Sequence, residues 1–132
     1  MKFETHLYSP KDFCLLESWW KAKNFPVADP ELLPPTGFIV TGDSVPICAG
    51  FLFKTDAKIA ILNHVVASSS PMDKEDRNKA MNLLISRVIL EARRGGFKIL
   101  SAACNIDRLG KRYESLGFVK TDSDESHYGR VL

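Results

Sequence analysis

The chain has 132 residues, of which 45% are hydrophobic and 26% are charged, and its formal net charge at pH 7 is only +2. These values are typical of one soluble globular domain, so we treat residues 1–132 as a single domain. The small net charge and the lack of a basic patch argue against a nucleic-acid binder. No apolar run is long enough to cross a membrane, so we expect no membrane partner.

Three cysteines, Cys14, Cys48 and Cys104, stand far apart in apolar surroundings. An odd number of scattered cysteines is typical of reduced, mostly buried thiols, so we expect a cytoplasmic protein without disulfides. The N-terminus lacks the apolar core of a signal peptide. No Cys/His cluster has the spacing of metal ligands, and we therefore predict no metal site.

The N-terminal half predicts a strand, a helix, a loop and three further strands. Residues 3–8 alternate between apolar and polar side chains, as in a strand. Residues 13–20 carry apolar side chains at helical spacing after a Ser-Pro start signal. Four prolines within residues 24–35 predict an irregular loop. Short turns then connect three strands of an antiparallel meander, expected at residues 37–41, 47–54 and 59–67.

The C-terminal half predicts the elements that complete a mixed sheet. An apolar stripe predicts a long helix over about residues 74–94, which two glycines end. A strand over residues 97–104 follows, and this strand–helix–strand crossover requires a parallel pair. A helix over residues 106–115 and a hairpin of residues 118–121 and 127–132 come last. The order β-α-loop-β-β-β-α-β-α-β-β predicts an α/β fold, a mixed sheet with helices on both faces.

The run Arg112-Tyr113-Glu114-Ser115-Leu116-Gly117-Phe118 is similar to the Tyr-Glu-x-Leu-Gly-Phe sequence found before the sixth strand of GNAT N-acetyltransferases. With the element order, it makes the whole chain resemble a GNAT-like domain with a central parallel pair of strands. Residues 18–21, 33–40 and 48–52 also resemble small GNAT-like proteins of bacteriophages and prophages. The resemblance implies direct transfer of an acetyl group from acetyl-CoA to a small-molecule or protein amine, in the cytoplasm of a bacterium or phage-infected host. It leaves the acceptor and the oligomeric state open, a homodimer being one option.

The resemblance also implies where the coenzyme binds. In the family, a bulge in the fourth strand splays it from the fifth, and the pantetheine arm pairs with the exposed backbone. The thioester would then be flanked by Asn63, Val65 and Val66, with Asn105 at the end of the fifth strand. An N-cap of the following helix is an equal alternative for Asn105. A backbone N–H of the fourth strand would polarise the thioester carbonyl.

The family's phosphate loop, Arg/Gln-x-x-Gly-x-Gly/Ala, aligns with residues 75–80, where only Ala80 conforms. Asn78 replaces the first glycine, and asparagine tolerates a left-handed backbone better than most residues. Arg77 and Lys79 could offset the two carboxylates at this helix start if they point at the ligand. The degenerate loop leaves a second interpretation open, a GNAT-like binding protein without catalysis.

Two side chains are candidates for catalysis. Tyr113 matches the family tyrosine that protonates the departing thiolate, a role that suits a phenol with a pKa near 10. A half-buried tyrosine that packs beside Phe118 is an equal alternative. His64 could take a proton from the substrate ammonium, although a structural or solvated histidine is the more frequent case. No cysteine or serine has a recognisable activating base, so we expect no acyl-enzyme.

Overall fold

The structure is a computed structural model that describes residues 1–104, 107–121 and 128–132. Its helices and strands follow the predicted order as far as the third helix. In chain order they are β1 (Phe3–Leu7), α1 (Phe13–Ala22), β2 (Gly37–Gly42), β3 (Val45–Lys54), β4 (Ile59–Ala67), α2 (Lys74–Arg94), β5 (Ile99–Ala102) and α3 (Asp107–Ser115). A short 3₁₀ turn at Pro10–Asp12 precedes α1, and a second one at Pro30–Leu32 lies within the proline-rich loop.

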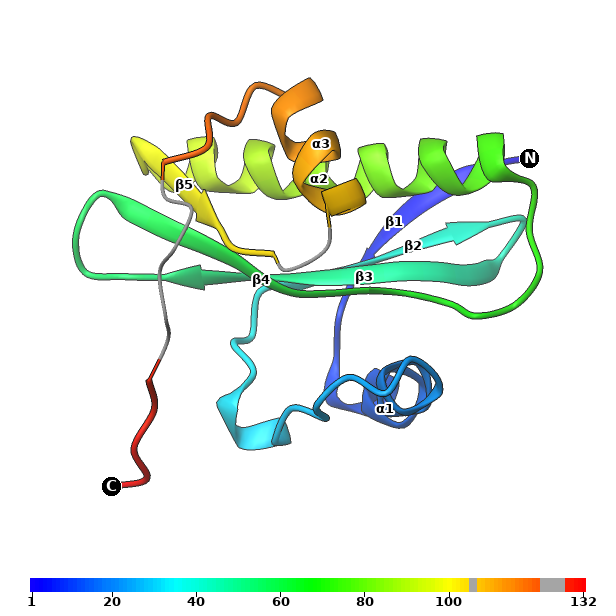
Figure 1. Ribbon diagram of the computed structural model, residues 1–132, viewed down its shortest axis with the longest axis horizontal. Coiled ribbons are helices and arrows are strands. Elements are labelled where there is room, and N and C mark those ends of the chain that lie inside the picture. Colours follow the sequence, from blue (N-terminus) through cyan, green and yellow to red (C-terminus); the bar gives the residue numbers. More distant parts are fainter. Residues whose placement is uncertain (105–106, 122–127) are drawn as a thin grey trace.

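The five strands form one mixed sheet in the order β1-β2-β3-β4-β5 (Figure 1). Neighbouring strands from β1 to β4 are antiparallel. The last pair is parallel and aligns Ile59–Leu62 of β4 with Ile99–Ala102 of β5. The crossover through α2 connects this parallel pair, which confirms the arrangement predicted from the order of elements.

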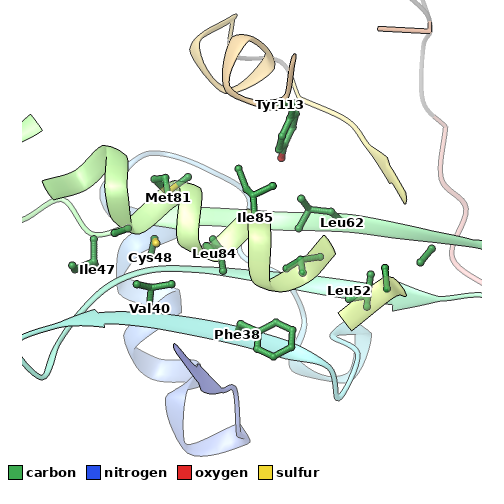
Figure 2. Close-up of a cluster of buried hydrophobic side chains, with 14 residues drawn as sticks. Phe38, Val40, Ile47, Cys48, Leu52, Leu62, Met81, Leu84, Ile85 and Tyr113 are labelled. Carbon is green, nitrogen blue, oxygen red and sulfur yellow. The ribbon is translucent and has the colours of Figure 1, made fainter. Parts of the chain in front are cut away.

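Helices cover both faces of the sheet, with α2 and α3 on one face and α1 on the other (Figure 1). The larger core lies between α2 and the sheet (Figure 2), and its fully buried side chains include Phe38, Leu52, Leu62, Leu84 and Ile85. The core under α1 is smaller and more aromatic, with Leu16, Trp19, Trp20, Phe51 and Val66. Each face of the sheet therefore packs against helices through a separate hydrophobic core, as a sheet with helices on both faces requires.

Glycines end α2 and α3 as the sequence predicts. Gly96 has a φ of +80° and Gly117 a φ of +96°, a region that residues with a Cβ avoid. Asp73 occupies the position before the first residue of α2, although its side chain makes no capping hydrogen bond. The start and the end of α2 are therefore confirmed.

The final hairpin is a prediction that the structure contradicts. The described parts, residues 118–121 and 128–132, contain no strand; residue 127 lies outside the described residues. Val119 is 81% exposed and Tyr128 95% exposed, so this segment supplies little apolar surface to bury against the sheet. A strand needs a paired neighbour and a buried face to offset its ordering entropy. The strand predicted over residues 97–104 is also shorter, because its pairing covers only Ile99–Ala102.

The cysteines are less buried than predicted. Cys48 lies in the core of β3, whereas Cys14 on α1 and Cys104 after β5 are exposed, and all three are free thiols. Cys104 is exposed because it follows the end of β5, where the sheet no longer covers it. Among the described residues, no helix is long and apolar enough to span a membrane, and no group of side chains could hold a metal ion.

Candidate active site

The register between β3 and β4 contains a bulge. Ala49 faces Val66 and Phe51 faces Asn63, so two steps along β3 correspond to three steps along β4. His64, in the extra segment, has a φ of +56°, a left-handed conformation that is uncommon outside glycine. A bulge bends its strand and interrupts the ladder, and such strain is often found at functional sites.

β4 and β5 separate immediately before this bulge. Their parallel pairing ends at Leu62 and Ala102, whereas β4 continues to Ala67. Within the described parts of the chain, residues 63–67 therefore have no strand partner on the side of β5. The N–H of His64 donates to Oδ1 of Asn63, and the remaining backbone groups on that side could pair with an extended ligand that adds to the sheet edge.

Asn63, Val65 and Val66 are the three β4 residues predicted to contact the coenzyme, and their side chains point in different directions. Val65 packs toward the α2 core, and Val66 is 2% exposed in the α1 core. Asn63 is exposed, and its Oδ1 accepts a hydrogen bond of 2.8 Å from the backbone N–H of His64. The valine side chains are thus used in packing, and only the backbone of residues 65 and 66 could bind a coenzyme.

The His64 imidazole lies on the α1 face of the sheet. Its ring centroid is 6.2 Å from that of Trp20 and 5.8 Å from that of Phe53. Burial in these aromatic surroundings lowers the pKa of His64 below its ordinary value of 6.5. The imidazole is therefore neutral at pH 7 and able to accept a proton.

Tyr113 lies on the opposite face. Its side chain is only 5% exposed, and its ring packs on Phe118 with centroids 5.1 Å apart. Figure 2 shows the ring pointing from α3 toward the sheet, with the hydroxyl leading. Burial raises the pKa of Tyr113, with a further contribution from Cys104. The phenol is therefore protonated at neutral pH and can act as a hydrogen-bond donor.

The positively charged side chains near the start of α2, Arg77 and Lys79, already bond to other groups of the protein. The Arg77 guanidinium donates to the carbonyl oxygens of Ser68 and Ser70, at 2.8 and 2.9 Å. Lys79 forms an exposed ion pair of 3.5 Å with Glu75, one turn away. Arg77 thus holds the loop between β4 and α2, and Lys79 offsets a carboxylate of its own helix.

Asn78 and Ala80, which the family resemblance places in the phosphate loop, both belong to α2. Asn78 lies within α2 and has no positive φ, so the left-handed backbone considered for it is absent. Its amide oxygen instead accepts a 2.8 Å hydrogen bond from Arg112 of α3. Ala80 is fully buried on the side of α2 that faces the sheet and packs in the core. Asn105 lies outside the described residues.

The first turn of α2 is an unfavourable setting for an anion. The N–H of Arg77 is already bonded to the carbonyl oxygen of Asp73. Three carboxylates, those of Asp73, Glu75 and Asp76, stand at or within this turn. They complement the helix dipole, but they would repel a phosphate group.

Sequence reasoning missed two features of this site. The first is the aromatic contact of Trp20 and Phe53 with His64, which depends on the bulge. The second is the hydrogen bonding of Arg112 with Asn78 and Asn82. The four-residue spacing of the two asparagines on a predicted helix could have indicated a shared partner.

We expect His64 to make stability depend on pH. Its pKa is lowered in the folded state, so the unfolded chain binds the proton more readily and stability falls as pH decreases through 6.5. The free energy of unfolding should therefore fall less steeply between about pH 7 and pH 5 in His64→Asn than in the wild type. Urea titrations across this range measure the slope. Parallel curves for the two proteins would show that His64 is not desolvated.

A scan of family models and a search of curated proteins gave no match to this sequence. Solved structures with similar folds are found. AAC(6')-Iy in complex with the bisubstrate analogue CoA-S-monomethyl-acetylneamine has a TM-score of 0.73 at 14% identity, covering 99% of this chain and 100% of its own. The ribosomal-protein-S18-alanine N-acetyltransferase from Escherichia coli has a TM-score of 0.71 at 15% identity, covering 92% and 80%.

A third similar structure is yncA, a proposed acetyltransferase from Salmonella typhimurium with its cofactor acetyl-CoA. It has a TM-score of 0.71 at 14% identity and covers 91% of this chain and 81% of its own. The TM-scores of all three indicate a shared fold, and identities this low establish the fold rather than the activity. The chain therefore has the fold of the GNAT acetyltransferases.

Proposed function

We propose that this protein is an acetyl-CoA-dependent N-acetyltransferase that transfers the acetyl group directly to an amine. The observation that carries the proposal is the bulge in β4 together with the loss of β4–β5 pairing after Leu62 and Ala102. This arrangement leaves a run of the β4 backbone, residues 63–67, without a strand partner on the β5 side in the described part of the chain. An extended amide-containing chain such as pantetheine can pair with such a run.

The coenzyme would supply the activated acetyl group as a thioester. The backbone of residues 63–66 would pair with the pantetheine arm, and one of its N–H groups would polarise the thioester carbonyl. Asn105, which lies outside the described residues, stays a candidate for contact with the coenzyme. The side chains of Val65 and Val66 keep this segment in place by packing into opposite cores.

His64 lies in the bulge, two residues past Leu62, and Tyr113 lies on the opposite face of the sheet, where Cys104, two residues past Ala102, contributes to its raised pKa. This placement suits one base and one donor. The neutral imidazole would take a proton from the substrate ammonium, directly or through water. The amine nitrogen then bonds to the carbonyl carbon, the carbon–sulfur bond breaks, and the second proton of the nitrogen passes to the departing thiolate or to water. Because an ordinary thiol has a pKa near 8.5, below that of Tyr113, the phenol would stabilise the departing thiolate chiefly by hydrogen bonding.

A second candidate function is a GNAT-like binding protein that does not catalyse transfer. The carboxylates of Asp73, Glu75 and Asp76 at the start of α2 favour it, because they oppose a phosphate at the position implied by the fold. The two candidates differ in whether the protein binds acetyl-CoA and releases free coenzyme A. Calorimetric titration with acetyl-CoA, followed by a thiol-release assay, separates them.

We expect Arg77→Ala to weaken acetyl-CoA binding about tenfold, because the variant removes a positive charge and releases the Ser68–Ser70 loop. Lys79→Ala removes an equal charge from an exposed, already paired position and is the matched control. Raising the salt concentration should weaken binding in the wild type. Equal affinity in Arg77→Ala and the wild type would mean that backbone amides or another site hold the phosphates.

The acceptor is proposed only as an amine of a small molecule or a protein. Two probes follow from the similar structures: neamine, and a peptide with an N-terminal alanine. Single-domain organisation over residues 1–132, a cytoplasmic location, the option of a homodimer and the resemblance to bacteriophage proteins stay predictions from the sequence.

A further inference from the structure

Arg112 of α3 connects this helix to α2. Its Nη2 donates to Oδ1 of Asn78 at 2.8 Å, and its Nη1 donates to Oδ1 of Asn82, also at 2.8 Å. Nη1 also lies 3.4 Å from the backbone carbonyl oxygen of Asn78. One guanidinium thus joins residues that are 30 and 34 positions apart in the sequence.

The partners of Arg112 match the shape of its side chain. Asn78 and Asn82 are four residues apart and lie on the same side of α2, so their amide oxygens form two acceptors in a row. A planar guanidinium presents two donors at once, which the single ammonium of lysine cannot reproduce. The only acceptors are neutral, and no ion pair involves Arg112 among the described residues.

α3 needs such a connection because it is short. It has nine residues, and a helix of this length is not stable by itself in water. Tyr113 is its one fully buried side chain in the described part, with Leu109 and Leu116 half-buried beside it. Arg112 precedes Tyr113 directly, so hydrogen bonds at Arg112 restrict the rotation of α3 about its axis and hence the direction of the Tyr113 ring.

We propose that Arg112, held by Asn78 and Asn82, is a positioning residue that fixes Tyr113 at the end of the β4–β5 pairing for acetyl transfer. This inference rests on the proposed function. It also gives a structural reason for asparagine at residue 78, where the family loop has glycine. Glycine has no side-chain acceptor, so it could not complete the contact with Arg112.

Two measurements test the proposal. Amide hydrogen exchange in α3 should be roughly tenfold faster in Arg112→Ala than in the wild type, because the helix loses its connection to α2. Arg112→Lys should behave like Arg112→Ala, since a point charge cannot bridge both asparagines. Lys111→Ala, an exposed charge on the same helix, is the control and should exchange like the wild type.

Turnover of acetyl-CoA with neamine or the alanine-terminated peptide is the second measurement. We expect Arg112→Ala to lower kcat about tenfold with little change in the KM for acetyl-CoA. In a Tyr113→Phe background the same substitution should cause no further loss, because the hydroxyl that Arg112 positions is already gone.

Unchanged exchange in Arg112→Ala would overturn the proposal, whatever the activity shows. An equal further loss of kcat in the Tyr113→Phe background would also overturn it, because Arg112 would then act independently of Tyr113. A wild-type protein that neither binds acetyl-CoA nor releases coenzyme A would overturn the proposed function and, with it, the positioning role. Hydrogen exchange would in that case still show whether the contact between α2 and α3 exists.

Discussion

Tyr113→Phe should lower the turnover number by about 10²-fold while leaving the affinity for acetyl-CoA close to that of the wild type. The substitution keeps the ring that packs on Phe118 and removes only the hydroxyl. The loss appears in kcat because the hydroxyl is proposed to contact sulfur only as the thiolate departs. Steady-state release of coenzyme A, with calorimetry for binding, measures both quantities.

Tyr128→Phe is the matched control for this experiment. Tyr128 is 95% exposed and also loses only a hydroxyl, so its turnover should equal that of the wild type. Full activity in Tyr113→Phe would remove Tyr113 from the mechanism and leave its role as packing beside Phe118. A labelled acetyl group trapped on Cys48 or Cys104, formed and consumed at the rate of turnover, would contradict direct transfer.

Deletion of His64 should abolish detectable acetyl-CoA binding, an expected loss of more than about 100-fold in affinity. Without the extra residue, Asn63 still faces Phe51 and Val66 still faces Ala49, so the β3–β4 ladder becomes regular. The bend that a bulge introduces is lost, and β4 can then run alongside β5 beyond Leu62. The backbone groups that we propose for the pantetheine arm would then be covered or turned away.

The variant His64→Asn separates the effect of the bulge on binding from the effect of the imidazole on turnover. Asparagine tolerates the left-handed conformation at this position, so the bulge is kept while the proposed base is removed. We expect this variant to bind acetyl-CoA normally and to lose turnover. Circular dichroism and a cooperative unfolding transition check that both variants fold. Wild-type affinity in the deletion variant would show that the bulge is not the coenzyme site.

The amino-acid pattern alone predicts the elements from β1 to α3 and the parallel direction of β4 and β5. Apolar periodicity marks the buried face of each helix, and glycines end α2 and α3 where a left-handed residue is needed. The crossover rule then leaves one arrangement for the two strands. The sequence misled at residues 118–121 and 128–132, because an apolar residue such as Val119 signals a strand only if a neighbouring strand can bury it.

The details of the candidate site depend on how the elements pack in three dimensions. The extra residue in β4 arises from how Ala49 and Phe51 align with a distant strand, so local alternation could not indicate that His64 faces α1. The direction of Arg77 toward the loop carbonyls and of Arg112 toward α2 depends on contacts that form only after the elements pack. Periodicity records burial along one element, whereas the geometry of the candidate site depends on distances between elements, and those are set by packing.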